Sequence, residues 1–237
     1  MGVLNVTPDS FSDGGQYQTV DTALQRAREM VEQGADLIDI GGESTRPGAV
    51  APSESEEMSR VMPIVEAVQS RFDIPISIDT STPSVITAAV CAKVALINDV
   101  RAFLRPGAIE AVGSYAMLAV MHMKGTPATM QEDPQYKDLI AEVNGFFTDR
   151  VRVLQNAGIQ RSRLILDPGF GFGKTLDQNF ELIRSLGGFR QHRIPILIGL
   201  SRKRSIQSIA TDVLAGSVAG ALAAVAGGAN MVRVHDV

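Results

Sequence analysis

The sequence predicts an α/β protein, a (β/α)8 TIM barrel formed as a single domain over residues 1–237. Eight short apolar, β-branched runs recur along the chain, and longer segments with helical periodicity separate them. Nearly every run ends in polar or ionisable residues, as expected where the carboxyl ends of barrel strands meet at an active site. The chain length suits one such barrel. A doubly wound open sheet is the alternative fold.

The expected strands and helices alternate along the whole chain. The strands are MGVLNV, LIDIGG, PISIDT, LINDV, AVMHM, LILDPG, ILIGLS and MVRVHDV. The helices lie at about residues 19–34, 55–71, 82–92, 106–116, 135–158, 176–188 and 205–227. The first of them has an apolar face and ends at Gly34, a typical helix C-cap. The sequence stops at the eighth strand, so we expect a barrel that lacks its final helix.

The composition excludes several classes of protein. Hydrophobic residues make up 45% of the chain, charged residues 20%, and the net charge is −4, so we expect a globular protein with no nucleic-acid partner. Cys91 is the only cysteine, which rules out an intrachain disulfide and favours a cytoplasmic location. The apolar run at residues 213–232 is long enough to cross a membrane, but it is rich in Gly and Ala. We therefore predict a buried helix that leads into a strand, and no membrane contact.

The stretch LILDPGFGFGKT, at residues 164–175, has the glycine content of a phosphate-binding loop but the wrong spacing. A P-loop requires glycine where Pro168 stands, and the Rossmann fingerprint fails because the three glycines strictly alternate. Asp167, at the end of the apolar run, is the stronger candidate for chemistry. An ATP- or NAD-binding loop remains the alternative.

Polar side chains end the predicted strands. They are Asn5, Asp39, Asp79, Asn98 with Asp99, His122, Asp167, Ser201, and Arg233 with His235. Asp79, Asn98 and Asp167 suit a neutral heterocycle with several N–H donors, because carboxylates accept paired hydrogen bonds and an amide offers both donor and acceptor. We expect no cationic wall opposite them. The alternative is that these residues only form turns and helix caps.

A second group is cationic and predicts an anion site. Arg46, Lys203, Arg233 and His235 suit a phosphate or pyrophosphate, and the last two alternate on one strand and so point to one side. The alternative is a solvated arginine and a histidine paired with Asp236. Asn5 offers a hard oxygen ligand for Mg²⁺. The loops TPDSFSDGG and GGESTRPGA are typical of covers that close over a barrel mouth.

Together these motifs resemble the dihydropteroate synthase family of the folate pathway. The matching segments are MGVLNVTPDSFSDGG, DIGGESTRPG, ISIDTS, LINDVR, MHMKGTP, LDPGFGFGKT, GLSRK and RVHDV, in order over almost the whole chain. The resemblance implies a barrel that joins p-aminobenzoate to 6-hydroxymethyl-7,8-dihydropterin pyrophosphate, with Mg²⁺ as cofactor and sulfonamides as inhibitors. It also implies a homodimer, formed through helices late in the barrel.

The resemblance also implies roles for individual residues. The pterin would be bound by Asp79, Asn98, Asp167, Lys203, Met123 and Phe172. Pyrophosphate would be bound by Asn5, Arg233 and His235, with Asn5 acting through Mg²⁺. The p-aminobenzoate site would be framed by Phe11, Thr45, Arg46, Pro47 and Ser201. Asp79, Lys203, Arg233 and His235 would be the catalytic residues.

Three other functions remain open at the level of sequence. A methyltetrahydrofolate-binding methyltransferase domain would share the pterin carboxylates, but it would not need TPDSFSDGG, SRK or the Arg233 and His235 pair. A non-catalytic pterin-binding module would bind pterin without turnover. A P-loop nucleotidase would bind ATP through the glycine loop.

Overall fold

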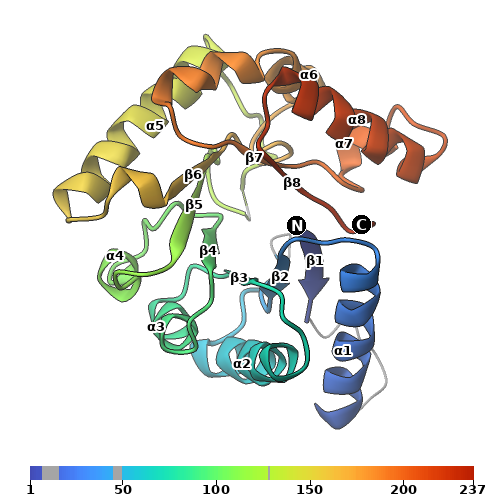
Figure 1. The fold of residues 1–237 in the computed structure, drawn as a ribbon. Coiled ribbons are helices and arrows are strands. Elements are labelled where there is room, and N and C mark those ends of the chain that lie inside the picture. The colour runs from blue at the N-terminus through green and yellow to red at the C-terminus, as the bar shows by residue number, and fades with distance from the viewer. Residues whose placement is uncertain (7–15, 45–49, 128) are drawn as a thin grey trace.

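The computed structural model describes residues 1–6, 16–44, 50–127 and 129–237, with side chains described from residue 20 onward in the second of these segments. Eight parallel strands in the described residues form a ring, and helices cover its outside (Figure 1). The strands are β1 Gly2–Asn5, β2 Ile38–Gly41, β3 Ile76–Asp79, β4 Leu96–Asp99, β5 Met117–Met121, β6 Leu164–Asp167, β7 Leu197–Gly199 and β8 Met231–Arg233. The eight predicted strands are therefore confirmed.

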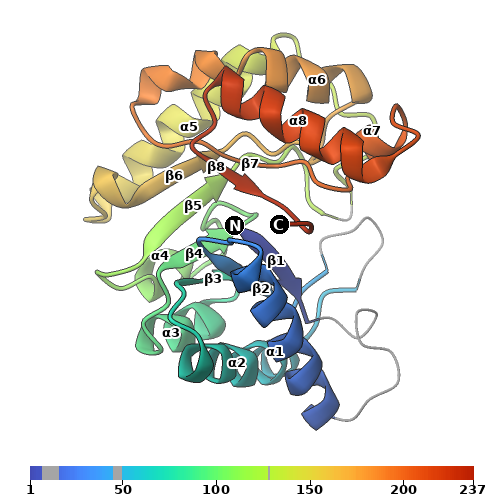
Figure 2. The same ribbon diagram turned by 45° about the vertical axis from the view of Figure 1, so that its right-hand side comes forward.

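Two narrow seams close the ring of strands. Strands β1 to β6 pair in sequence order as one sheet, and β7 pairs with β8 as a second. A single bridge between Leu166 and Ile196 joins β6 to the β7 side, and a bridge between Gly2 and Val234 joins β1 to the β8 side. The two chain ends consequently lie side by side (Figures 1 and 2). This closure confirms the (β/α)8 barrel and decides against the open sheet.

The helices follow the predicted order with three differences in extent. They are α1 Gln16–Glu32, α2 Glu54–Arg71, α3 Pro83–Cys91, α4 Ala108–Ala111, α5 Leu139–Asn156, α6 Leu176–Arg184, α7 Arg204–Gln207 and α8 Val213–Gly227. The helix expected at 106–116 is a single turn. The helix expected at 135–158 begins only at Leu139, because the Asp138 side chain caps it by accepting the Ala141 N–H at 2.9 Å. The helix expected at 205–227 is two helices, since Asp212 caps α8 separately.

The core has two layers, set by the alternation of side chains along each strand. Residues such as Ile38 and Ile40 point outward and pack against the helices, whereas their neighbours point into the barrel. One end of the barrel is filled by apolar side chains, namely Met1, Leu37, Leu96, Ala119, Ile165 and Leu197. Asp39 and Ser77, both buried, lie further along strands β2 and β3, where the side chains inside the barrel become polar. The barrel is therefore closed by apolar packing at one end and polar at the other.

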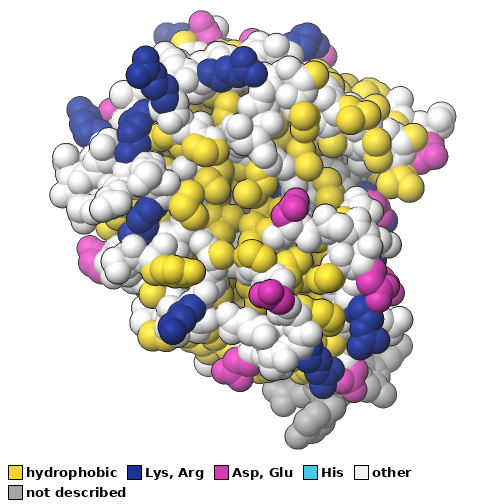
Figure 3. All heavy atoms as spheres, in the orientation of Figure 1, with side chains coloured by type: hydrophobic (Ala, Val, Ile, Leu, Met, Phe, Trp, Pro, Cys, Tyr) yellow, Lys and Arg dark blue, Asp and Glu magenta, His cyan; other side chains and the backbone are white. Residues whose placement is uncertain are grey.

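Helix α8 is not the buried helix that the sequence predicts. Its small residues face inward: a Cβ on Gly216 would lie 2.5 Å from the Ala210 Cβ, and one on Gly220 would lie 2.9 Å from Leu200. Its large apolar residues face outward and are 49–67% exposed, namely Leu214, Val218, Leu222 and Val225. Figure 3 shows hydrophobic side chains gathered where Figure 1 places α7 and α8.

Within the described residues, no helix combines the length and hydropathy needed to cross a bilayer.

Candidate active site

Arg233 lies at the centre of the polar end of the barrel. From the end of β8 its Nε donates to the Asp39 Oδ2 at 2.6 Å, and its Nη2 donates to the Asp79 Oδ2 at 2.8 Å. The Asn98 amide donates to the same Asp39 oxygen at 3.3 Å. Three of the strands that close the barrel thus meet through one guanidinium group.

This arrangement corrects the prediction that Asp79, Asn98 and Asp167 face no cation. The polar ends of β3, β4 and β6 were expected to form an acidic and amide wall, but Arg233 lies between Asp79 of that wall and Asp39 of β2. Burial is the reason, because Asp39 is completely inaccessible to solvent and a buried carboxylate requires a charged or hydrogen-bonding partner. The sequence separation of 194 residues between Arg233 and Asp39 hides this pair until the barrel closes.

Asp79 is held in an environment that favours its neutral form. Burial raises the pKa of the Asp79 carboxyl to about 7, while Arg233 acts in the opposite direction and Asp39 adds to the rise. The alternative role of Asp79 as a helix cap is wrong, because Thr82 occupies the N-cap position of α3. Asp79 therefore changes its charge near neutral pH, which suits a group that responds to charge on a bound molecule.

Asp167 combines a local and a functional position. Its Oδ1 accepts the Gly169 N–H at 2.7 Å, so the predicted turn-forming role is present. Burial raises the pKa of its carboxyl, and the charge of Lys203 acts against that rise. Only one carboxylate oxygen takes part in the turn. The other oxygen has no hydrogen-bond partner among the described residues and is free to bind a ligand.

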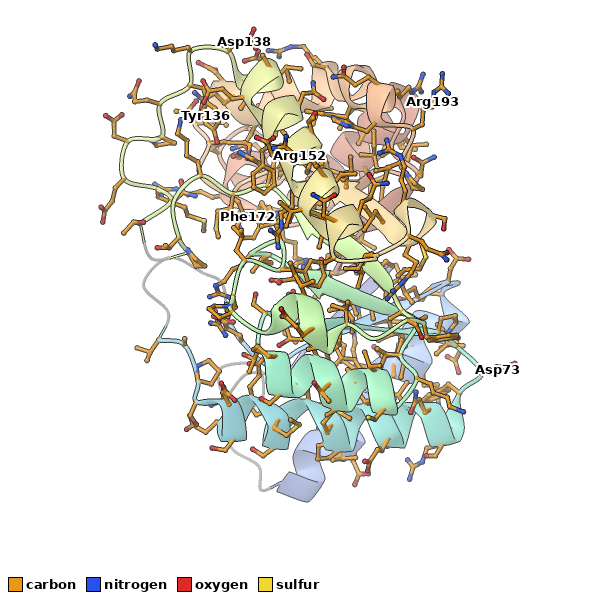
Figure 4. All side chains as sticks on the ribbon, turned by 90° about the vertical axis from the view of Figure 1, so that its left-hand side faces the viewer. Asp73, Tyr136, Asp138, Arg152, Phe172 and Arg193 are labelled. Carbon is orange, nitrogen blue, oxygen red and sulfur yellow. The ribbon has the colours of Figure 1, made fainter. Side chains whose placement is uncertain are left out.

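Lys203 follows β7 and lies against the glycine loop. Its Nζ donates to the Phe170 carbonyl at 2.5 Å and lies 4.5 Å from the centroid of the Phe172 ring. Burial lowers the pKa of this amine to about 8, although Asp167 acts to raise it. Figure 4 shows Phe172 at the end of the barrel opposite Asp73, which precedes β3. Lys203 and Phe172 therefore lie together at the polar end, as predicted.

The glycine loop packs too tightly against the segment after β5 to cradle a nucleotide. Gly169, Gly171 and Gly173 all have positive φ, and a Cβ on Gly169 would lie 1.9 Å from the His122 carbonyl oxygen. Lys174, which would be the phosphate-binding lysine of a P-loop, is 2% exposed. Its Nζ donates to the carbonyls of Gly169 and Phe172, both at 3.0 Å, and lies 3.1 Å from the His122 Nδ1. The Lys174 amine therefore stabilises the conformation of the glycine loop.

Lys174 is one of three contributions whose role the sequence did not indicate. Asp39 is the second, because the sequence marks it as a strand-ending residue but not as the buried partner of Arg233. The third is an ion pair in which Arg101 donates to both oxygens of Glu43, at 2.6 and 3.0 Å, and to the Ser81 Oγ at 3.0 Å. This ion pair ties together the segments that follow β2, β3 and β4 beside the site.

Ser201 and His235 contact each other at the ends of β7 and β8. The Ser201 Oγ accepts the His235 backbone N–H at 3.2 Å and lies 3.2 Å from the ring Nδ1. Burial, assisted by the charges of Arg233 and Arg202, lowers the pKa of the His235 ring to about 4. The predicted alternative of a His235 pair with Asp236 is not formed, because Asp236 binds Arg202, whose Nε donates to it at 2.8 Å.

The remaining predicted residues are placed in part. Asn5 ends β1 and is half-buried, and its side-chain amide makes no hydrogen bond to a described residue. Met123 lines a pocket together with Val100, Met121 and Phe146. Phe11, Thr45, Arg46 and Pro47 lie outside the described residues. Among the residues that the structure describes, no three His, Cys, Asp or Glu side chains cluster to hold a metal.

Comparison with known proteins agrees with this geometry. Residues 1–235 match the family described as Pterin binding enzyme. The chain is 47% identical to dihydropteroate synthase of Escherichia coli (strain K12) over 242 residues, covering all of this chain and 86% of the relative.

Solved structures give the same result. A Yersinia pestis dihydropteroate synthase with a sulfonamide drug has a TM-score of 0.93 at 48% identity, and a Xanthomonas albilineans dihydropteroate synthase with 4-aminobenzoic acid has 0.92 at 45%. Both matches cover all of this chain, and they cover 87% and 86% of those chains, respectively. The chain therefore belongs to the pterin-binding enzymes and, among them, to the dihydropteroate synthase family.

Proposed function

We propose that the polar end of this barrel condenses 6-hydroxymethyl-7,8-dihydropterin pyrophosphate with p-aminobenzoate, giving 7,8-dihydropteroate and pyrophosphate. The observation that carries the proposal is the set of buried ionisable groups around Arg233, on a family member whose relatives are crystallised with 4-aminobenzoic acid and a sulfonamide. The whole chain acts as one domain in this proposal, since the family match spans residues 1–235.

The pterin lies against Asp79, Asn98, Asp167 and Lys203, with Phe172 and Met123 shaping the pocket. Asp167 has one carboxylate oxygen without a hydrogen-bond partner among the described residues, which can accept from the N–H groups of the pterin, and Asn98 supplies both donor and acceptor atoms. Lys203 presents a buried amine above the Phe172 ring. These contacts orient a flat heterocycle and read its hydrogen-bonding edge.

The pyrophosphate lies against Arg233, His235 and Asn5. A guanidinium has five N–H donors, and the two bonds to Asp39 and Asp79 leave three for an anion. Arg233 is therefore held in place by its carboxylates while it still binds the leaving group. His235, two residues after Arg233 at the end of β8, adds a further hydrogen bond.

Mg²⁺ fits this site as an ion shared with the substrate. The described residues offer no cluster of three acidic or imidazole ligands, but Mg²⁺ commonly takes one or two protein oxygens and completes its shell with phosphate oxygens and water. The Asn5 amide oxygen, which makes no hydrogen bond to a described residue, is such a ligand. When bound, the ion would stabilise negative charge on the pyrophosphate.

The reaction begins with departure of pyrophosphate, and the p-aminobenzoate amine then attacks the resulting pterin cation. The new C–N nitrogen releases one proton to water to give dihydropteroate. Arg233 and His235 stabilise the charge that develops on the leaving group. Asp79, whose carboxyl is poised near neutral pH, stabilises the cation. We assign Phe11, Thr45, Arg46 and Pro47 to the p-aminobenzoate site, where sulfonamides would compete.

Turnover by the purified protein tests the proposal directly. With the pterin pyrophosphate, Mg²⁺ and p-aminobenzoate present, we expect pyrophosphate release and a matching amount of dihydropteroate by chromatography. Omission of p-aminobenzoate should abolish the product. Binding of the pterin pyrophosphate without product under all conditions would instead favour a non-catalytic pterin-binding module.

We also propose a homodimer in which two copies bury the outer face of α8. Four large apolar side chains, Leu214, Val218, Leu222 and Val225, lie along this face at helical spacing and are about half exposed or more. An uncharged apolar face of this kind is typical of an interface.

A cytoplasmic location is likewise a proposal, based on the single cysteine.

Leu222→Glu is expected to convert the dimer to a monomer, because it would bury a charge against the same face of the second copy. The measurement is the mass in solution by sedimentation at equal protein concentrations. Val153→Glu is the matched control, since Val153 is a 41% exposed residue on the separate helix α5. A parent protein that sediments as a monomer would contradict the proposal.

A further inference from the structure

Ser201 touches His235 at two points, and the register of the strands explains why. Gly199 on β7 is paired with Arg233 on β8, so the residues two positions later lie opposite each other as well. The Ser201 Oγ accepts the His235 backbone N–H at 3.2 Å and lies 3.2 Å from the ring Nδ1. Ser201 is 4% exposed, so these contacts are shielded from water.

Counting hydrogens assigns the direction of the bond to the ring. A serine hydroxyl has one hydrogen to donate and two lone pairs to accept with. If Nδ1 carried the ring proton, the Ser201 Oγ would accept two bonds, and its own buried hydrogen would have no acceptor among the described residues. If the hydroxyl donates to Nδ1, every group is satisfied. The ring proton is then on Nε2.

The position of this proton matters because the environment of the ring favours its neutral form. Burial, assisted by Arg233 and Arg202, lowers the pKa of His235 to about 4, and Asp236, which acts in the opposite direction, is bound by Arg202. A neutral imidazole has only one N–H to donate. The Nε2 has no hydrogen-bond partner among the described residues, so this atom is available to a ligand.

We propose that Ser201 is a positioning residue that holds neutral His235 in its Nε2–H form, so that the ring donates a hydrogen bond to the pyrophosphate group. This inference rests on the proposed function. It gives Ser201 a role on the leaving-group side of the reaction, whereas the family resemblance implies a contact with p-aminobenzoate. Without the serine hydroxyl, His235 is free to carry its proton on Nδ1, and an acceptor nitrogen would then face an anion.

The first test reads the tautomer directly by ¹⁵N NMR of the histidine ring in the ligand-free protein. The chain has three histidines, and His235→Gln identifies which signals belong to His235. We expect the parent to show a protonated Nε2 and an unprotonated Nδ1. Ser201→Ala should shift both signals toward a mixture, and Ser201→Thr, which keeps the hydroxyl, should restore the parent pattern.

The second test measures binding of inorganic pyrophosphate with Mg²⁺ present, and KM for both substrates. Ser201→Ala should weaken pyrophosphate binding and raise KM for the pterin pyrophosphate by roughly tenfold, the loss expected for one hydrogen bond to a charged group. KM for p-aminobenzoate should remain within about twofold, a change too small to signify a lost contact. Ser201→Thr should recover the parent values.

Two results would overturn the proposal. One is an unchanged Nε2–H signal in Ser201→Ala. The other is a raised KM for p-aminobenzoate with unaltered pyrophosphate affinity, which would return Ser201 to the second substrate. Neither the NMR nor the pyrophosphate titration requires turnover, so failure of dihydropteroate synthesis in the parent protein would be recognised separately.

Discussion

We expect Arg233→Met to abolish dihydropteroate formation and to lower the free energy of unfolding by about 3–5 kcal/mol, the cost typical of removing one partner from a buried ion pair. Asp39 is fully buried, and Arg233 is its only charged partner among the described residues. Methionine fills similar space but leaves this carboxylate and that of Asp79 without a cation. Chemical denaturation and the coupled synthesis assay measure the two effects.

The double variant Arg233→Met with Asp39→Asn separates stability from catalysis. Asparagine removes the buried charge while keeping nearly the same shape, so the double variant should recover much of the lost stability. Activity should remain absent, because no guanidinium faces the pyrophosphate. Substantial turnover in either variant would contradict the role assigned to Arg233.

The second large effect is a bell-shaped dependence of kcat/KM on pH. Asp79 must be ionised to stabilise a cation, and burial raises its pKa to about 7, so activity should rise as the pH passes upward through that value. Lys203 must be protonated to donate, and burial lowers its pKa to about 8, so activity should fall above it. The maximum is expected between these two values, and rates at saturating Mg²⁺ across about pH 5.5–9.5 give the profile.

Single variants identify which residue causes each limb of the profile. Lys203→Met should lower kcat/KM for the pterin pyrophosphate by about 100- to 1,000-fold, as for loss of one preorganised donor, and should remove the alkaline limb. Asp79→Asn should remove the acidic limb. Ionisation of the substrate itself is the same for all three proteins, so a limb that persists in every variant belongs to the substrate.

The barrel was predictable because its signals are local. Alternation of apolar strands with helical segments is visible in short windows, and so are strand-ending residues such as Asp79, Asn98 and Asp167. Helix limits were less predictable, since they depend on individual capping side chains such as Asp138 and Asp212. A capping aspartate cannot be distinguished by sequence from an aspartate inside the first turn.

Long-range pairing accounts for the features that sequence reasoning missed. Arg233 on β8 binds Asp39 on β2, and neither local sequence indicates this pairing. The two residues meet only when the barrel closes. Lys174 was considered only as a phosphate ligand, because its burial against His122 depends on how the glycine loop packs. The exposed face of α8 was taken for a buried one, since a run without charges does not reveal which of its sides is covered.

The two seams of the barrel divide it into unequal parts. Strands β1 to β6 are held by continuous ladders, whereas the β7 and β8 pair is joined to them by one bridge on each side. Amide hydrogens of residues 196–199 and 231–234 should therefore exchange faster than those of β2 to β5, as expected for a smaller cooperative unit. Arg233 spans one of these seams through its bonds to Asp39 and Asp79. A pyrophosphate held between Arg233, His235 and Asn5 would connect β8 to β1 across the same seam. We therefore expect bound substrate to slow amide exchange in β7 and β8 and so to stabilise the closed barrel.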